Sequence, residues 1–304
     1  MEKISVLIPS FNRAGYLPET IASVLRQSYQ EFEIIVLDDG STDGTPQIMS
    51  LFTDPRIYYH RRQRTGLLPR LRNQLAELST GSFLAFLDSD DLWHEKKLEM
   101  CITACKTEQA EFCLSDCVEF TTQGQSTKTA GASLRQQSHV DLKKEILINN
   151  VTLTYGSNIF TSRKLFNQLN GFDENMFHGD HDFVCRALWH GKNCYLREPL
   201  NLIRRHDKNM SSDNLNDERP YEEYNTTILK LLGSGLIVMN EVAHIITKNN
   251  YLAALSIARK KGNLSGGRYL FDKTKNKLSF NEMQYLVKFF IKTFGSNFQS
   301  RTSR

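Results

Sequence analysis

The first hundred residues alternate between short apolar runs and longer segments whose apolar residues recur every three or four positions. The apolar runs predict four buried strands, at Ile4–Ile8, Phe32–Leu37, Ile57–His60 and Phe83–Leu87. Helical spacing predicts helices over Leu17–Ser28 and Leu68–Leu78. Strands that alternate with helices are typical of a parallel sheet covered by helices. The pattern therefore predicts an α/β, Rossmann-like domain with a mostly parallel central sheet.

Strand signals continue to about residue 212, and beyond that point only helical patterns remain. In the later part of the α/β region, the residue pattern predicts a polar loop at 121–137. It also predicts strands at Val151–Phe160 and Cys194–Arg205, and helices at Arg163–Leu169 and Asp182–His190. Further helices are predicted at Tyr224–Gly233, Leu236–Thr247, Tyr251–Lys261 and Phe280–Phe294. We therefore predict one domain of residues 1–212, followed by an α-helical region of residues 213–304.

Polar segments directly follow three of the predicted strands, at Pro9–Asn12, Asp38–Ser41 and Asp88–Asp91. The carboxyl ends of parallel strands meet at one edge of a sheet, and ligands of open α/β sheets bind beyond that edge. Any one of these segments alone could be a surface turn. Their convergence predicts a ligand site.

The segment FLDSDDLW, which ends at Trp93, puts three carboxylates into four residues. Like charges this close repel each other, and a divalent cation relieves the repulsion. Mg²⁺ is typically held by one or two carboxylates plus substrate phosphates, and the Asp88-Ser89-Asp90 arrangement offers two. Such an ion neutralises charge on a departing diphosphate. The alternative is structural, with Asp90 or Asp91 capping the helix that follows.

The charge of the chain is small overall and uneven along its length. A net charge of +4 over 304 residues predicts no nucleic acid partner. From Arg259 onward, 11 Lys and Arg residues against 2 Asp and Glu residues give +9, which leaves about −5 for the rest. A basic end favours either an anionic membrane surface or a solvated tail, and both readings stay open. Its helix at 280–294, with Lys288 and Lys292, favours packing on a protein surface over an interfacial position.

Neither a signal peptide nor a membrane span is predicted, because only a short apolar run follows Met1–Lys3 and no run of 18 apolar residues exists. We expect a cytoplasmic protein, peripheral at the inner membrane face if its basic end binds lipid. Six cysteines fit that compartment as free thiols. Cys101, Cys105, Cys113 and Cys117 lack the close pairs of structural zinc sites, so ordinary packing is favoured.

Three separated segments carry a family resemblance: VLIPSFNRAGYLPETIASVLRQSYQEFEIIVLDDGSTDGT, RTGLLPRLRNQLAELSTGSFLAFLDSDDLWHEKKLE and SNIFTSRKLFNQLNGFDENMFHGDHDFVCRAL. In order, spacing and residue types, residues 3–212 resemble family 2 of the inverting glycosyltransferases, which has the GT-A fold. The resemblance implies a nucleotide-sugar donor, commonly a UDP-sugar, and a Mn²⁺ or Mg²⁺ ion. A saccharide or lipid-linked acceptor in the synthesis of cell-surface polysaccharide or glycolipid is expected.

The resemblance also implies roles for residues of the first two loops and the second predicted helix. Pro9, Ser10 and Arg13 match the segment that lines the nucleoside pocket. Asp39 matches the acid that contacts the base, and a carboxylate acceptor suits the imide N–H of uracil. Arg72 matches an arginine beside the nucleotide. Without the resemblance, Arg13 would be interpreted as a surface charge, Asp39 as a turn residue and Arg72 as a cation on the face of a helix.

The acidic segment and a later histidine complete the implied donor site. Asp90 matches the metal ligand, and Asp88 matches the first acid, near the ribose or the metal, with Ser89 between them. His206 lies where family members carry a histidine near the diphosphate, so it is a candidate metal ligand or phosphate donor. An exposed basic turn explains His206 equally well. Residues 206–213 are a candidate lid that would exclude water.

Sugar transfer with inversion needs a base that deprotonates the acceptor hydroxyl. The family usually has Glu-Asp and, one residue later, a second Asp, whereas this chain has Gly179-Asp180-His181-Asp182. Asp180 falls on the base position. Asp182 is the rival, although it could equally be structural or cap a helix. Gly179 replaces the usual Glu and departs from the family pattern.

Other functions lack their motifs. The chain has no G-x-G-x-x-G after the first strand and no G-x-x-x-x-G-K-[ST], so a dinucleotide oxidoreductase and a P-loop NTPase are poorly supported. A processive synthase would carry membrane helices and a Q-x-x-R-W motif, so transfer of a single sugar is favoured. Because of Gly179, a catalytically degenerate GT-A protein that binds nucleotide or acts as a scaffold stays open. The identity of the sugar and the oligomeric state are not determined by the sequence.

Overall fold

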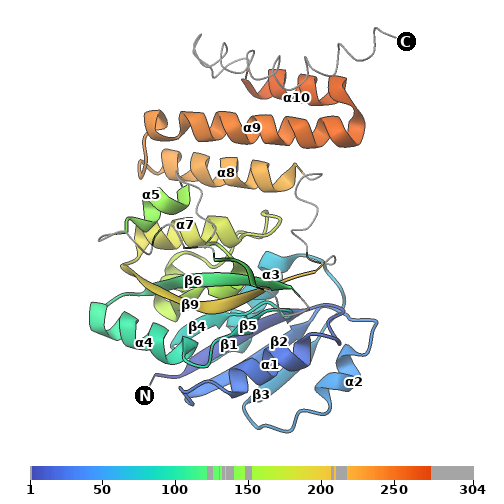
Figure 1. Ribbon diagram of the computed structural model, residues 1–304, viewed down its shortest axis with the longest axis vertical. Coiled ribbons are helices and arrows are strands. Elements are labelled where there is room, and N and C mark those ends of the chain that lie inside the picture. Colours follow the sequence, from blue (N-terminus) through green and yellow to red (C-terminus); the bar gives the residue numbers. More distant parts are fainter. Residues whose placement is uncertain are drawn as a thin grey trace. The chain divides into compact units, whose positions relative to one another are not determined.

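A computed structural model describes residues 2–121, 126–129, 131, 134, 140–147, 153–206, 209 and 218–274 (Figure 1). The chain divides into two compact units. The first comprises Met1–Ser212 with Gly233–Leu236, and the second comprises Asp213–Leu232 with Ile237–Arg304. The domain boundary predicted between residues 212 and 213 falls outside the described ranges and stays a prediction.

Strands and helices alternate along the first unit. Its strands are β1 (Ile4–Ser10), β2 (Phe32–Asp38), β3 (Ile57–Arg61), β4 (Phe83–Phe86), β5 (Leu92–Trp93), β6 (Phe112–Thr121), β7 (Ser126–Thr129), β8 (Phe160–Ser162) and β9 (Asn193–Arg205). Its helices are α1 (Leu17–Leu25), α2 (Thr45–Met49), α3 (Leu68–Leu78), α4 (Lys97–Glu108), α5 (Leu142–Leu147), the 3₁₀ turn η2 (Gly156–Asn158), α6 (Arg163–Gln168) and α7 (Asp180–His190).

Among the described residues, the nine strands form one sheet in the order β3-β2-β1-β4-β8-β6-β9-β5, with β7 paired to β6. β1 runs parallel to β2 and β4, β2 to β3, and β6 to β9. The pairs β4–β8, β6–β8, β6–β7 and β5–β9 are antiparallel and shorter. The predicted α/β fold with a mostly parallel sheet is confirmed.

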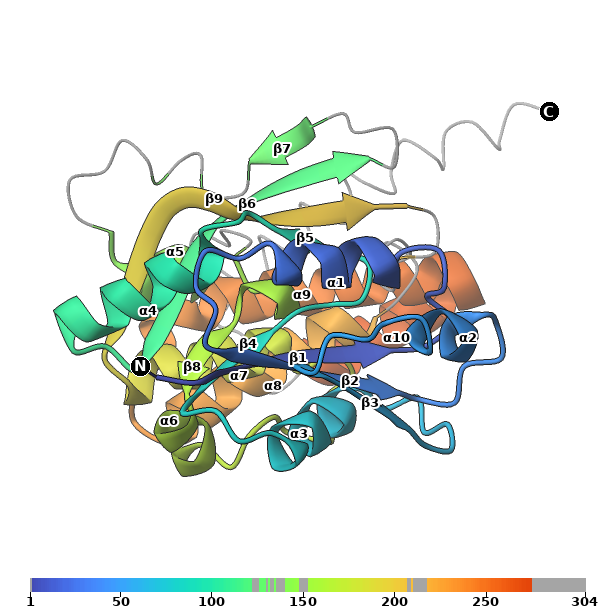
Figure 2. The same cartoon turned by 90° about the horizontal axis from the view of Figure 1, so that it is seen from below.

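Helices cover both faces of the parallel strands. Ile4, Val6 and Ile8 point to one face, where they form a core with Ile21 and Val24 of α1. Side chains alternate along a strand, so the intervening residues face the opposite way. There α3 packs against β1 and β2, and Figure 2 shows α1 and α3 on opposite sides of these strands. This sandwich brings the carboxyl ends of β1, β2 and β4 to one edge.

Several elements of the first unit differ from the sequence-based expectation. The apolar run at Val151–Phe160 does not form a strand over its described part, which holds η2 and only the first residue of β8. The polar loop predicted at 121–137 contains β7, and its remaining residues lie largely outside the described ones. β6 escaped prediction because Ser115 and Asp116, both fully buried, interrupt its apolar pattern.

The second unit is helical over its described residues, with α8 (Arg219–Gly233), α9 (Met239–Lys261) and α10 (Asn263–Thr274). A helix break predicted between Thr247 and Tyr251 is wrong, because α9 runs through it. The polar residues read as the break instead pair with α8. Asn225 Nδ2 donates to Asn250 Oδ1 at 2.8 Å, and Asn249 Nδ2 donates to Asn225 Oδ1 at 3.2 Å. The helix predicted at Phe280–Phe294 lies outside the described residues.

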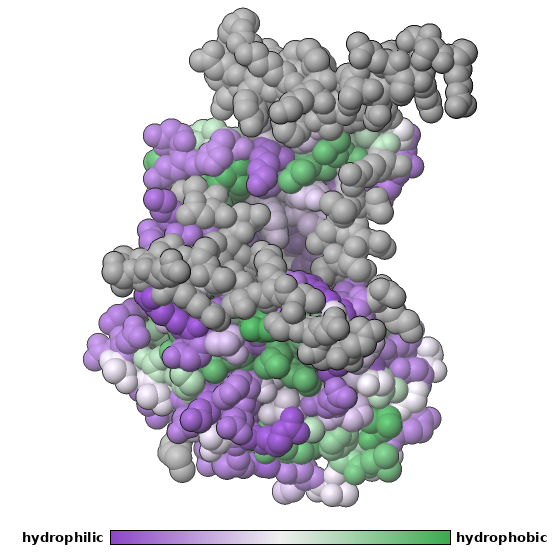
Figure 3. All heavy atoms as spheres, in the orientation of Figure 1, coloured by the Kyte–Doolittle hydropathy of each residue, from purple (hydrophilic) through white to green (hydrophobic). Residues whose placement is uncertain are grey.

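The surface shows scattered apolar side chains. On the face drawn in Figure 3, hydrophobic residues (green) form separate patches among hydrophilic ones (purple). The large exposed apolar side chains include Leu51, Leu229, Met239 and Leu264. Within the described ranges, no helix combines the length and the apolar character needed to cross a membrane.

Candidate active site

The loops that follow β1 and β2 are fastened to each other at the carboxyl edge of the sheet. The Asp39 N–H donates to the Ser10 carbonyl at 2.8 Å. Asn12 adopts a φ of +52°, and its Oδ1 accepts from the Thr42 N–H at 2.8 Å. Pro9 and Ser10 are buried, and the Ser10 hydroxyl has no hydrogen-bond partner among the described residues. The first predicted nucleoside-pocket residues therefore form part of a rigid edge.

Asp39, predicted to contact the base, is buried beneath the loop that follows β3. Its Oδ1 accepts from the Thr65 N–H at 2.9 Å, and its Oδ2 accepts from the Gly66 N–H at 2.7 Å. Arg64 Nη1 lies 3.7 Å from Oδ2, while its guanidinium lies 3.2 Å from the ring centroid of Phe11. Thr65 Oγ1 also donates to Oδ1 at 3.0 Å, so a further bond from a ligand would have to go to Oδ2.

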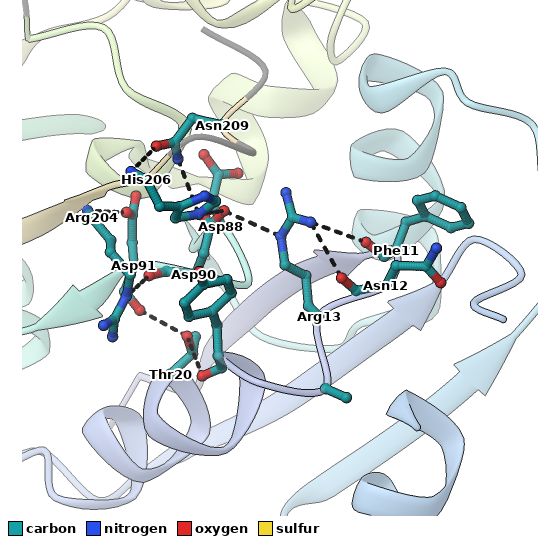
Figure 4. A network of polar contacts seen from close by, with 12 residues as sticks. Phe11, Asn12, Arg13, Thr20, Asp88, Asp90, Asp91, Arg204, His206 and Asn209 are labelled. Carbon is teal, nitrogen blue, oxygen red and sulfur yellow. Dashed lines mark hydrogen bonds and ion pairs between the residues drawn. The ribbon is translucent and has the colours of Figure 1, made fainter. Parts of the chain in front are cut away.

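Arg13, Asp90 and His206 come together although they lie far apart in the sequence (Figure 4). Asp90 Oδ2 lies 3.2 Å from Arg13 Nε and 3.1 Å from His206 Nε2. The His206 ring stacks on Tyr16, with ring centroids 4.6 Å apart and an interplanar angle of 13°. The backbone N–H of His206 donates to Asn209 Oδ1 at 2.6 Å. The reading of His206 as an exposed turn residue is wrong, because its side chain is only 5% exposed.

Asp91 does not cap a helix, and neither does Asp90, because α4 begins only at Lys97, after β5. The Asp91 carboxyl is buried instead, with Oδ2 accepting from Ser157 Oγ at 2.6 Å and Oδ1 from the Arg204 N–H at 2.8 Å. Burial, together with the charges of Asp90 and Asp88, holds the pKa of Asp91 well above its usual range. Asp91 is therefore a structural anchor between the acidic segment, η2 and β9.

Arg72 joins two acidic segments that are separated by about half of the first unit's sequence. Its guanidinium is fully buried, donates through Nη2 to Asp88 Oδ1 at 2.9 Å, and donates through Nη1 to Asp180 Oδ1. Burial opposes its positive charge, but the two carboxylates outweigh burial and raise the pKa of Arg72. The contact puts the predicted base beside the first acid of the D-x-D segment.

Asp182, the rival base, is fully buried and bound elsewhere. Arg186 donates to its Oδ2 through Nε at 2.8 Å and lies 2.7 Å away through Nη2. The same guanidinium donates to the carbonyl oxygens of Leu169 and Gly171, at 2.9 and 3.0 Å. Asp182 therefore orients the Arg186 guanidinium that fastens α7 to the loop after α6. We expect it to be unavailable to an acceptor hydroxyl.

Gly179 has a structural reason to be glycine in this chain. It immediately precedes α7 with a φ of +76°, a conformation that L side chains rarely adopt. A Cβ added there would also lie 3.1 Å from Cγ of Pro69. The glutamate that the family usually carries would therefore require a different local backbone.

The acidic residues leave atoms for a divalent cation. In the part of the chain that the structure describes, Asp88 Oδ2 and Asp90 Oδ1 make no hydrogen bond, and the Asp88 side chain is 32% exposed. Ser89 between them is buried. Carboxylate oxygens suit Mg²⁺ and Mn²⁺, so the donor set fits the expected ion. Within the described residues, however, the candidate ligand atoms of Asp88, Asp90 and His206 do not all lie within 4.8 Å of one another.

A cavity of about 570 Å³ adjoins the Asp39 loop between the segment after β3 and α3. Its walls carry three arginines, Arg62, Arg64 and Arg70, together with Glu77. Leu37, Gln63, Thr65, Gln74 and Leu78 complete the lining. The cavity therefore presents mainly positive charge next to the buried acid.

Sequence patterns did not single out Phe11, Tyr16, Ser157 or Arg204 at this site. Arg204 Nε donates to the Asp90 carbonyl at 2.8 Å, and its Nη2 donates to Glu19 Oε2 at 2.6 Å. Ser157 accepts from the Asp88 N–H at 3.0 Å while its hydroxyl donates to Asp91. Phe11, Tyr16 and Ser157 lie within the segments that carry the family resemblance, but the resemblance assigned them no role.

Comparison with known proteins identifies a family. Residues 5–169 match the family model described as glycosyl transferase family 2. An uncharacterised glycosyltransferase of Rickettsia felis is 41% identical over 99 residues, covering 32% of this chain and 16% of that protein. The Escherichia coli UDP-Glc:alpha-D-GlcNAc-diphosphoundecaprenol beta-1,3-glucosyltransferase WfgD is 38% identical over 100 residues, covering 33% of this chain and 40% of WfgD. The chain thus matches less than half the length of these relatives.

Among solved structures, the crystal structure of Staphylococcus aureus TarS 1–349 in complex with UDP-GlcNAc superposes with a TM-score of 0.65. The match covers 92% of this chain and 77% of the TarS chain, at 20% sequence identity. A likeness at this identity establishes a shared fold. It confirms the predicted GT-A architecture.

Proposed function

Because the chain belongs to glycosyltransferase family 2, we propose that it transfers a single sugar, with inversion, from a UDP-sugar to a saccharide or lipid-linked acceptor. WfgD is named for a UDP-glucose donor and a diphosphoundecaprenol-linked acceptor, and TarS was crystallised with UDP-GlcNAc. Such a reaction belongs to the synthesis of cell-surface polysaccharide or glycolipid. We assign the transfer to residues 1–212, at the cytoplasmic side of the membrane. The basic end within 213–304 is the proposed peripheral membrane contact.

The bridge made by Arg72 is the observation that carries the proposal. A transferase must hold the acceptor oxygen about 3–3.5 Å from the sugar carbon of the donor, with the base within hydrogen-bond reach of that oxygen, so the groups that serve donor and acceptor must lie together. Arg72 contacts both Asp88, on the donor side, and Asp180, on the acceptor side. Two segments that match the family motif separately are thus joined by a single buried cation.

The nucleoside would lie at the edge formed by the loops after β1 and β2. Pro9, Ser10 and Arg13 would line its pocket, and Asp39 would accept the imide N–H of uracil. The rigid Ser10–Asp39 contact and the two backbone N–H groups on Asp39 support this role, because they hold the acceptor in a fixed position. A guanine edge offers different donors, so UDP is favoured over GDP.

Asp90 and Asp88, with His206, would hold a Mn²⁺ or Mg²⁺ ion. When bound, such an ion neutralises charge on the diphosphate as it departs. In the described structure Arg13 and His206 hold Asp90 Oδ2, so the acid is already oriented toward this position. Arg13 can also contact the donor phosphates once the Asp90 carboxylate is otherwise engaged. Ser89, buried between the acids, would position the donor-side backbone.

Asp180 would accept the proton of the acceptor hydroxyl, whose oxygen attacks the anomeric carbon as the bond to the nucleoside diphosphate breaks. Its place at the first position of α7 and its contact with Arg72 support this role. The burial of Asp182 and its bonds to Arg186 leave Asp180 as the acid of α7 suited to the task. Gly179 favours a second candidate, a nucleotide-binding protein without transferase activity.

Calorimetric titration with UDP and with GDP, each with and without Mn²⁺, tests the donor assignment. We expect UDP binding that needs the ion and is lost in Asp90→Ala. Asp54→Asn is the matched control, since Asp54 pairs with Arg56 before β3, outside the site. UDP binding without transfer to any acceptor would support the second candidate. A folded protein that binds neither nucleotide would overturn both proposals.

A further inference from the structure

Three cysteine side chains meet inside the core of the first unit. Cys105 of α4, Cys113 of β6 and Cys194 of β9 have their Sγ atoms within 4.8 Å of one another. Each is at most 3% exposed, and all three belong to one apolar core. Their residues lie on three elements, and none contributes to the proposed transfer site.

The spacing of the sulfur atoms matches a metal centre better than a disulfide. Sγ of Cys105 and Sγ of Cys194 are 4.0 Å apart, about twice the ~2.05 Å length of an S–S bond. Three thiolates at about 2.3 Å around one ion would be separated from each other by about 4 Å. The triangle therefore needs only small side-chain movements to surround a metal ion.

A buried lysine on the same helix supplies a second, independent observation. Lys97, Cys101 and Cys105 recur every four residues and so share one face of α4. The Lys97 side chain is fully buried, and its Nζ donates to the neutral groups Ser115 Oγ at 3.2 Å and Asn158 Oδ1 at 3.4 Å. No carboxylate within the described residues forms an ion pair with it.

An unpaired buried ammonium group is costly unless a negative charge lies nearby. Lys97 interacts electrostatically with Cys101, which in turn interacts with Cys113 of the triangle. Three thiolates around a monovalent or divalent ion carry a net negative charge. The same cation that lacks a carboxylate would therefore offset the charge of a metal–thiolate centre.

We infer that Cys105, Cys113 and Cys194 form a binding site for one thiophilic metal ion, Cu(I) or Zn(II), that ties α4 to β6 and β9. Thiolate ligands favour these ions over the oxygen-preferring Mg²⁺ and Mn²⁺ of the transfer site. With Cu(I) the triangle completes a three-coordinate centre. Zn(II) prefers four ligands, and Cys101, which lies outside the group of three, would have to move closer to supply the fourth. The ion would enter during folding, because the site is closed to solvent.

The test is refolding of the full chain under anaerobic, reducing conditions with one equivalent of Zn(II) or of Cu(I), followed by gel filtration and metal analysis. We expect one ion per chain from at least one of the two metals and a raised melting temperature. X-ray absorption should find three or four sulfur neighbours at about 2.3 Å. Three sulfurs with Cu(I) alone would assign the trigonal form, and four with Zn(II) would assign the form that includes Cys101.

Cys194→Ser should lose the ion, whereas the control Cys185→Ser should retain it, because Cys185 is a buried free thiol of α7 outside the triangle. If Cys194→Ser fails to fold, the number of sulfur neighbours that X-ray absorption finds around the ion in the wild-type protein still tests the inference. Folded wild-type protein that retains neither ion would overturn the inference. So would an ion held by nitrogen and oxygen only, or one bound equally by Cys194→Ser. These readouts do not depend on glycosyl transfer.

Discussion

The two acidic segments of the first unit, Asp88–Asp91 and Asp180–Asp182, are built on the same plan. Each has one acid that is buried and bound by structural partners: Asp91 by Ser157 and the Arg204 N–H, and Asp182 by Arg186. Each also has an acid that contacts Arg72, namely Asp88 or Asp180. In each segment, one acid thus supports the structure and another, two or three residues away, belongs to the proposed transfer site.

The difference between the segments lies in what else holds them. The first is fixed from several directions, since Arg13, His206 and Arg204 all contact Asp90. The second lies at the start of one helix, after a glycine with positive φ. Burial and partner charges, and not spacing in the sequence, therefore decide which acid is available to a substrate. The predictions that follow test this division.

Removal of the shared cation should have the largest effect. Arg72→Met leaves Asp88 and Asp180 without their common partner, and breaking a buried ion pair costs about 3–5 kcal/mol. We expect loss of UDP-sugar turnover together with a lower urea midpoint. Arg72→Lys keeps the charge but cannot bridge two carboxylates through one planar group, so it should restore stability more than turnover. Equal activity in Arg72→Met and wild type would contradict the shared site.

Asp182→Asn separates the structural acid from the catalytic one. It removes the charge that Arg186 pairs with, so we expect a loss of about 3 kcal/mol in unfolding free energy. Below the melting transition, kcat should stay within about threefold of wild type if Asp182 makes no interaction specific to the transition state. Urea unfolding and steady-state turnover at 15 °C measure the two effects separately. A stable but inactive variant would make Asp182 the base.

Asp91→Asn should change the dependence of stability on pH. A raised pKa means that folded protein keeps its proton while the unfolded chain releases one, so wild-type stability falls as pH rises above the ordinary value of 3.8. Asparagine has no proton to release there. The variant should therefore gain stability relative to wild type between pH 4.5 and pH 7.5. Parallel stability curves for the two proteins would exclude a buried, protonated Asp91.

Gly179→Ala should have the smallest effect. A positive φ disfavours any L side chain by about 1–2 kcal/mol, and the added Cβ approaches Pro69. We expect a modest fall in melting temperature and a small fall in kcat, because Asp180 follows directly. Gly233→Ala is the comparison, because Gly233 has no positive φ and a Cβ added there would meet no atom within 4 Å. A larger kcat loss than stability loss would show that Gly179 orients Asp180.

Sequence patterns predicted those elements whose apolar residues recur at regular local spacing. β1, β2, β3 and β4 are buried apolar runs, and their loops carry most of the candidate residues. β6 and the continuity of α9 were not predicted, because buried polar side chains, Asp116 and Asn250, find partners elsewhere in the chain.

The candidate site was predictable as a set of residues but not as a set of contacts. Motif positions placed Asp88, Asp90 and Asp180 without help from the structure. The contact of Arg72 with two of them, and the stacking of His206 on Tyr16, depend on how α3, α7 and the end of β9 pack. Such packing involves residues 16 to 190 positions apart, which no local pattern records.

Turnover of Asp180→Asn is the most direct test of the division between the acids. With UDP-glucose and UDP-GlcNAc as donors and UDP release as the readout, kcat should fall by roughly 10²–10⁴-fold, the usual contribution of a general base. UDP affinity should stay close to that of wild type. Retention of wild-type kcat in Asp180→Asn, with UDP binding intact, would contradict the assignment of Asp180 as the base.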